Sequence, residues 1–163
     1  MFVEAHATVP LKLRDAQAAI DEAIADGGLT AESQRAAGDD ATFLLRVGPK
    51  GSRGPAKQVR VEVLPSHWVG TKVVVALRWE ATGAAQRLFP SLDANLTLSA
   101  LDPNQTWLSI VGSYRPPLDA VTAGIDRAVL SKAAERTLAA LLAEIVAKIA
   151  QLAPPNSLHA AGS

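Results

Sequence analysis

Hydrophobic and polar residues alternate at the start of the chain and then change to helical spacing. In residues 2–9 every second side chain is hydrophobic, which predicts a half-buried strand. After Pro10 hydrophobic residues recur at helical intervals, so we expect a helix that begins near this proline and ends at Gly27-Gly28. Thr30 is a candidate N-cap for a short second helix that would end by Gly38.

A period of two returns at Thr42 and continues, with interruptions, to Tyr114. It predicts five strands, near residues 43–47, 58–63, 72–80, 92–100 and 106–114. We expect the inward face of the last four to carry hydrophobic and aromatic side chains and no ionisable ones: Val59, Val61, Val63, Val73, Val75, Leu77, Trp79, Leu96, Leu98, Leu108, Ile110 and Tyr114.

A long helix is predicted after Pro116-Pro117, which stop the last strand. At about 100° per residue, its large hydrophobic residues form one stripe, made of Leu138, Leu141, Leu142, Ile145, Ile149 and Leu152. Toward the N-terminus the stripe passes through small or polar residues, namely Ala134, Ser131, Arg127 and Gly124.

The change of side-chain size along this stripe predicts that the C-terminal half of the helix fills a core and the N-terminal half leaves space. Ile125, Val129 and Leu130 fall beside the stripe, where they would pack on the first two helices or face a partner. A bend in the helix, or a drift of its phase, would instead turn Ile125 and Val129 toward the sheet and leave little cavity.

Consecutive strands joined by short turns pair antiparallel, and their polar residues imply one solvated face. The apolar face needs a cover, and the last helix is the longest element available. The fold class is therefore α+β: a curved antiparallel sheet of about six strands wrapped around a long C-terminal helix, with two short helices after the first strand. Residues 1–152 are expected to form one domain, and residues 153–163 a disordered tail.

A short motif follows the last predicted strand and leads into the long helix: Gly112, Tyr114, Pro116, Pro117, Gly124, Asp126 and Arg127. With the order of elements, it resembles the START-like superfamily, also called SRPBCC or helix-grip proteins, and especially its small bacterial, polyketide cyclase-like members. The resemblance covers residues 1–152 in topology and 112–142 in motif. Asp119 and Thr122 depart from it, since glycines are common after the prolines. The resemblance implies a cavity between sheet and helix that binds hydrophobic or amphipathic molecules.

Composition narrows the range of partners and compartments. Sixteen basic residues balance sixteen acidic ones, which argues against binding to nucleic acid or to an anionic membrane surface. The chain has no cysteine, which excludes disulfides and thiol chemistry. We expect no signal peptide and no stable membrane insertion, because the most hydrophobic stretch is short and contains Glu144 and Lys148. A cytoplasmic protein is the expectation, either a monomer or a homodimer.

No stretch of the sequence forms a strong catalytic, metal or cofactor motif. The segment GPKGSRG lacks the ending of a phosphate-binding loop. The three histidines, His6, His67 and His159, have no metal-ligand spacing. We therefore predict no cofactor, no metal and no catalytic residue. The low aromatic content favours an acyl chain over a planar ligand.

The candidate site is the region between the sheet and the helix. Its predicted lining is Val61, Val75, Leu77, Trp79, Leu96, Leu98, Ile110 and Tyr114 from the strands, with Arg127, Ser131, Ala134 and Leu138 from the helix. Trp79 and Tyr114 either pack in the core, each with one satisfied hydrogen bond, or contact the ligand. Arg127 either pairs with a nearby acid such as Asp126 or anchors an acidic head group at the mouth of the cavity.

These features favour a small-molecule binding protein that holds a lipid-like or polyketide-like ligand. One alternative is an enzyme of the polyketide cyclase or hydratase kind, in which Tyr114 and Arg127 polarise a carbonyl. Another is a protein-interaction module whose cavity has collapsed. Enzymatic activity is not the preferred hypothesis, because the predicted inward faces of the strands contain no ionisable side chain.

Overall fold

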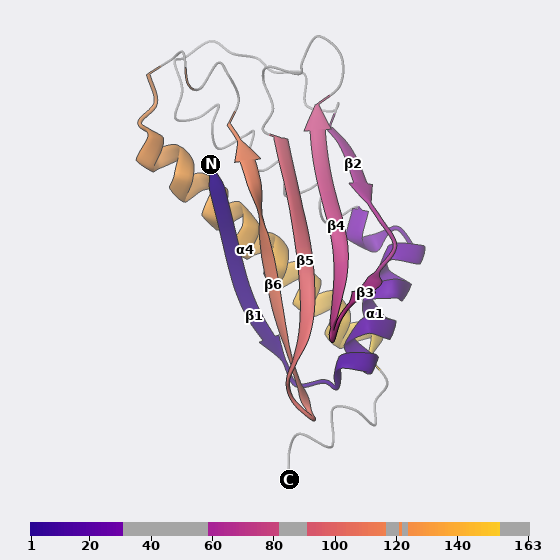
Figure 1. Ribbon diagram of the computed structural model, residues 1–163. Helices are drawn as coiled ribbons and strands as arrows, with labels where there is room; N and C mark the ends of the chain where they lie inside the picture. Colours follow the sequence, from indigo (N-terminus) through magenta and orange to yellow (C-terminus); the bar gives the residue numbers. More distant parts are fainter. Residues whose placement is uncertain (31–58, 82–90, 117–120, 122–123, 154–163) are drawn as a thin grey trace.

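The computed structural model describes residues 1–30, 59–81, 91–116, 121 and 124–153 (Figure 1). In chain order the elements are β1 (Phe2–Val9), α1 (Leu13–Ala25), β2 (Val59–Val63), β3 (His67–Val69), β4 (Lys72–Ala81), β5 (Ser91–Asp102), β6 (Gln105–Arg115) and α4 (Arg127–Leu152). Residues 28–30 are helical. The rest of the predicted second helix, the strand at 43–47, the glycine-rich loop, Asp119, Thr122 and residues 154–163 lie outside the described residues.

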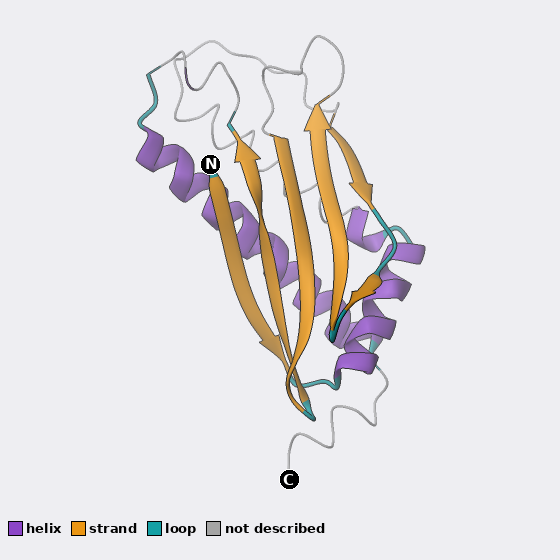
Figure 2. Cartoon of the chain, viewed as in Figure 1, coloured by secondary structure: helices purple, strands orange, loops and turns teal. Residues whose placement is uncertain are grey.

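Six strands of the described residues form one antiparallel sheet in the order β1-β6-β5-β4-β2, and β3 also pairs with β4. The first strand therefore lies beside the last, with Val3 opposite Gly112. Figure 1 shows that the long strands curve in the same direction. In the same view, Figure 2 shows α4 crossing behind the sheet, with α1 near the C-terminal end of α4. The predicted fold class is thus confirmed: α+β, with a curved antiparallel sheet and a long C-terminal helix. The short strand β3 was not predicted.

The inner face of the sheet is hydrophobic because every second side chain of the central strands points to the core. The side chains buried there by β4, β5 and β6 are Val73, Val75, Leu77, Trp79, Leu92, Ala94, Leu96, Leu98, Leu108, Ile110 and Tyr114. The predicted inward set is confirmed for these strands. In β2, Val61 and Val63 are only half-buried, since β2 lies at the edge of the sheet. The side chain of Val59 lies outside the described part.

Gly112 allows β6 to approach β5 closely on the inner face. A Cβ atom at this position would lie 2.4 Å from the backbone oxygen of Asp93 and 2.5 Å from the Cβ of Ala94. Real Cβ atoms essentially never come so near another heavy atom. The glycine of the Gly-x-Tyr motif is therefore required by the packing of two neighbouring strands.

Helix α1 follows β1 and packs one side against the core. Its buried residues are Ala16, Ala19, Ile20 and Ala23, at helical spacing. It begins at Leu13, three residues after the expected start at Pro10. It ends where predicted, because Gly27 has a φ of 77°, a left-handed conformation that glycine adopts without steric cost.

The start of α4 is set by Asp126, which was not predicted as a cap. Its carboxylate accepts a hydrogen bond from the backbone N–H of Ala128 at 2.9 Å, as an N-cap side chain does. Gly124, two residues earlier, has a φ of 75° and turns the chain into the helix. At the other end Ala153, expected to begin the tail, is buried against the core.

Candidate ligand-binding region

The predicted strand residues of the site lie together on the inner face of the sheet. Val75, Leu77, Trp79, Leu96, Leu98, Ile110 and Tyr114 are each at most 1% exposed. They come from β4, β5 and β6, which are adjacent in the sheet. Val61, on the neighbouring edge strand β2, is half-buried opposite Trp79. The sheet therefore brings these residues into one continuous hydrophobic surface, and their contact with a ligand stays a prediction.

One transverse row of this surface runs from Trp79 to the beginning of the chain. Trp79 lies opposite Leu92, and Leu92 lies opposite Tyr114. Met1 extends the row on the side of β1. Its terminal amino group donates to the backbone carbonyl oxygen of Tyr114 at 2.7 Å, and its own carbonyl oxygen accepts from the backbone N–H of Tyr114 at 2.8 Å. Met1 also packs against Leu130 and Ala133 of α4. The N-terminal half of α4 therefore reaches the end of the sheet that carries Trp79 and Tyr114 (Figure 1).

Along α4 the buried side chains change from large to small, as the sequence predicts. The C-terminal half, residues 138–152, buries Leu138, Leu141, Leu142, Ile145 and Ile149. The N-terminal half, residues 127–137, buries Leu130, Ala133 and Ala134. Ala134 and Leu138, both predicted site residues, are fully buried.

The predicted position of Leu130 was wrong. It was expected beside the stripe, against the first two helices or a partner, but it is buried and packs with Met1 and Ile125. Helical periodicity alone does not show from which side a neighbouring strand covers the helix, and here Met1 covers Leu130. Val129 is half-buried.

Two predicted helix residues lie farther from the interior. Ser131 is half-buried, and its hydroxyl donates to Glu135 at 3.5 Å. Arg127 is exposed in the first turn of α4, where a charged group stays hydrated. The ion pairs between described residues do not include Arg127, and Asp126, its proposed partner, caps the helix instead.

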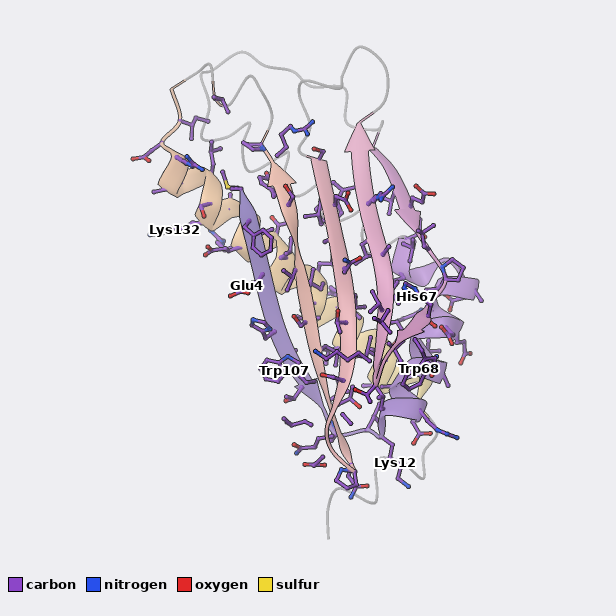
Figure 3. All side chains as sticks on the ribbon, viewed as in Figure 1. Glu4, Lys12, His67, Trp68, Trp107 and Lys132 are labelled. Atoms are coloured by element: carbon purple, nitrogen blue, oxygen red, sulfur yellow. The ribbon has the colours of Figure 1, made fainter. Side chains whose placement is uncertain are left out.

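The interior formed by the described residues carries no ionised side chain. Thr106 is the buried polar residue, and its hydroxyl donates to the backbone oxygen of Leu11 at 2.8 Å. Several charged and aromatic residues lie on the outer surfaces: Figure 3 shows Glu4 and Trp107 on the side of β1 and β6, and His67 and Trp68 at β3. Three or more potential metal ligands do not cluster anywhere in the described part.

The histidines of this part are exposed, as expected. The ring of His6 lies 5.2 Å from that of Trp107, on the outer face of the sheet. His67 belongs to β3 rather than to a turn. Among the described helices, none has the length and hydrophobicity to cross a membrane.

Trp79 differs from the expectation that it would pack with one satisfied hydrogen bond. Its side chain is 1% exposed, and its Nε1 atom has no hydrogen-bond partner among the described residues. Buried donors in folded proteins nearly always have an acceptor. The alternation of residues in β4 identified Trp79 as inward-facing. Because a pattern of this kind does not place acceptors around an indole nitrogen, the sequence did not indicate that this donor would lack one.

No protein-family model matches the sequence, and no curated protein matches it. Several solved structures are similar to the chain at low sequence identity. A conserved protein from Geobacillus kaustophilus is 10% identical, with a TM-score of 0.50 over 93% of this chain and 96% of that one. A START superfamily protein from Mycobacterium smegmatis is 11% identical, with a TM-score of 0.45 over 93% and 98% of the two chains.

An aromatase/cyclase from Streptomyces is 12% identical, with a TM-score of 0.40 over 93% of this chain and 94% of that one. Identities at this level concern the fold and leave ligand and activity open. The observed arrangement is a long C-terminal helix held against a curved antiparallel sheet whose first and last strands are neighbours. The chain therefore has a helix-grip fold.

Proposed function

We propose that this protein binds a hydrophobic or amphipathic small molecule, lipid-like or polyketide-like, between the inner face of the sheet and the N-terminal half of α4. The observation that carries the proposal is the change in side-chain size along α4, from leucine and isoleucine to Ala133 and Ala134. The same end of the sheet also bears small residues, since Ala94 and Gly112 are paired on its inner face. Small side chains on both surfaces favour space for a ligand.

The chemistry of the surrounding surface supports a hydrophobic ligand. The buried side chains of the described sheet and helices are hydrocarbon or aromatic, apart from Thr106. When an apolar ligand covers a surface of this kind, the free energy falls by about 25 cal/mol for each Å² of apolar area that is buried. The cyclase or hydratase alternative has less support, because Arg127 is exposed at the start of α4 whereas Tyr114 is buried.

The experiment replaces Ala134, whose side chain is fully buried, by phenylalanine. The neutral fluorescent probe N-phenyl-1-naphthylamine would be titrated into wild-type protein and into Ala134→Phe. We expect the larger ring to occupy the ligand space, so the affinity for the probe falls about tenfold, which corresponds to ~1.4 kcal/mol, while the circular dichroism spectrum is kept. Native mass spectrometry of the wild type should also show a co-purified small molecule, reduced in the variant.

Ala140→Phe is the matched control, because Ala140 is exposed on the same helix. It should bind the probe as the wild type does. Equal affinities of all three proteins would contradict the assigned site. An Ala134→Phe protein that fails to fold, together with a wild type that binds no probe, would favour the interaction module with a filled interior.

A further inference from the structure

Trp79 combines deep burial with an unused hydrogen-bond donor. Its side chain is 1% exposed, and its Nε1 atom has no partner within the described part of the chain. An indole N–H can donate a hydrogen bond but cannot accept one. A buried donor without an acceptor lowers stability, so folded proteins seldom keep one unless another group supplies the acceptor.

The neighbours of Trp79 on the inner face do not supply that acceptor. Val61 on β2 and Leu92 on β5 lie directly opposite it, and Leu77 is the next inward residue of β4. All three side chains are hydrocarbon. The indole N–H therefore stands in a surface that offers hydrophobic contact.

The same surroundings restrict the chemistry of the acceptor. No charged side chain is buried among the described residues, so a carboxylate beside Trp79 would lack a counter-ion, which is costly in a hydrophobic interior. A hydroxyl group would add a donor that itself needs an acceptor. The carbonyl oxygen of a ketone or an ester is neutral and only accepts, so it fits the single unused donor.

We propose that Trp79 Nε1 donates a hydrogen bond to the carbonyl oxygen of a neutral ligand, a ketone or an ester with a long hydrocarbon part. This inference rests on the proposed function and specifies its ligand class. Trp79 fixes one end of the ligand, and the hydrocarbon part lies along the row of Leu92 and Tyr114 toward Ala134. The site selects against free carboxylates and against hydrocarbons without an acceptor.

The experiment uses a protein in which Trp79 is the sole tryptophan. The chain has three tryptophans, and the other two, Trp68 and Trp107, are 49% and 37% exposed, so the double variant Trp68→Phe/Trp107→Phe should fold. Its one indole N–H resonance is then that of Trp79. We expect 2-decanone to move this proton resonance downfield and decane not to move it.

Binding constants complete the test. Displacement of N-phenyl-1-naphthylamine should show that 2-decanone binds about tenfold more tightly than decane and more tightly than decanoate. The Trp79→Phe variant should bind 2-decanone and decane equally. Bound 2-decanone without a shift of the indole proton, or a ketone preference that persists in Trp79→Phe, would overturn this inference alone. If the probe and all three compounds fail to bind the wild type, the proposed function falls, and this inference falls with it.

Discussion

The two halves of α4 cover one sheet with side chains of very different size. The C-terminal half, residues 138–152, buries five leucines and isoleucines, whereas the N-terminal half, residues 127–137, buries Leu130 and two alanines. The C-terminal half also meets α1, where the Lys148 nitrogen lies 3.7 Å from an Asp26 carboxylate oxygen. The N-terminal half packs on Met1, at the other end of the sheet (Figure 1). One half therefore contributes far more hydrocarbon to the interior than the other.

This difference separates stability from ligand binding along a single helix. Full burial of a leucine or isoleucine contributes about 1.5–3 kcal/mol, and an alanine contributes much less. The C-terminal half should thus supply most of the helix's packing energy. The N-terminal half can keep small side chains, as at Ala133 and Ala134, because the fold is already stabilised at the α1 end.

The largest expected effect is from Ile145→Ala in the C-terminal half. Ile145 is fully buried, so the truncation leaves a cavity and should lower the free energy of unfolding by about 3 kcal/mol. Urea denaturation would measure the loss. The neighbouring exposed variant Glu144→Ala should change stability by less than about 0.5 kcal/mol. A larger loss from Leu130→Ala than from Ile145→Ala would contradict the division between the halves.

A smaller loss is expected from Gly112→Ala on the sheet. The added Cβ would lie 2.4 Å from the Asp93 oxygen, so β5 and β6 must move apart, at a cost of about 2 kcal/mol. Chemical denaturation measures this, with the exposed neighbour Ser113→Ala as the control. Because Gly112 lies opposite Val3 and beside the row of Tyr114, the variant should also weaken binding of N-phenyl-1-naphthylamine. Unchanged stability would show that the two strands have room to separate.

Much of the fold could be predicted because its signals are local. The period of two in β4, β5 and β6 identified the inward residues, and Pro116 marked the end of the last strand, which the structure places at Arg115. The strand β3 was missed because it has only three residues, all exposed, and therefore carries no hydrophobic alternation. The cap at Asp126 follows a known preference for aspartate at this position, although an N-cap was predicted only for the earlier helix, at Thr30.

The candidate site was less predictable because it depends on contacts between distant parts of the chain. The burial of Leu130 comes from Met1, which is far away in sequence. Whether the Trp79 indole N–H has a hydrogen-bond partner depends on the groups around Nε1. Those groups follow from the pairing of β4 with β2 and β5. The exposure of Arg127 depends on the residue at which α4 begins. Periodicity assigns each residue to one face of its helix or strand, but it does not identify the residues of other elements that pack against it.

The smallest expected effect is at the first turn of α4, where Asp126 caps the helix. Asp126→Ala removes the acceptor for the Ala128 N–H and should lower the local stability of the first turn of α4 by about 1 kcal/mol, whereas Asp126→Asn keeps an acceptor and should lose less. The loss should be confined to the N-terminal half, because the large side chains of the other half keep their contacts. Amide hydrogen exchange would then increase at Ala128–Leu130 and stay unchanged at Ile145. Equal increases at both places would mean that α4 unfolds as one unit, and that its two halves are not energetically distinct.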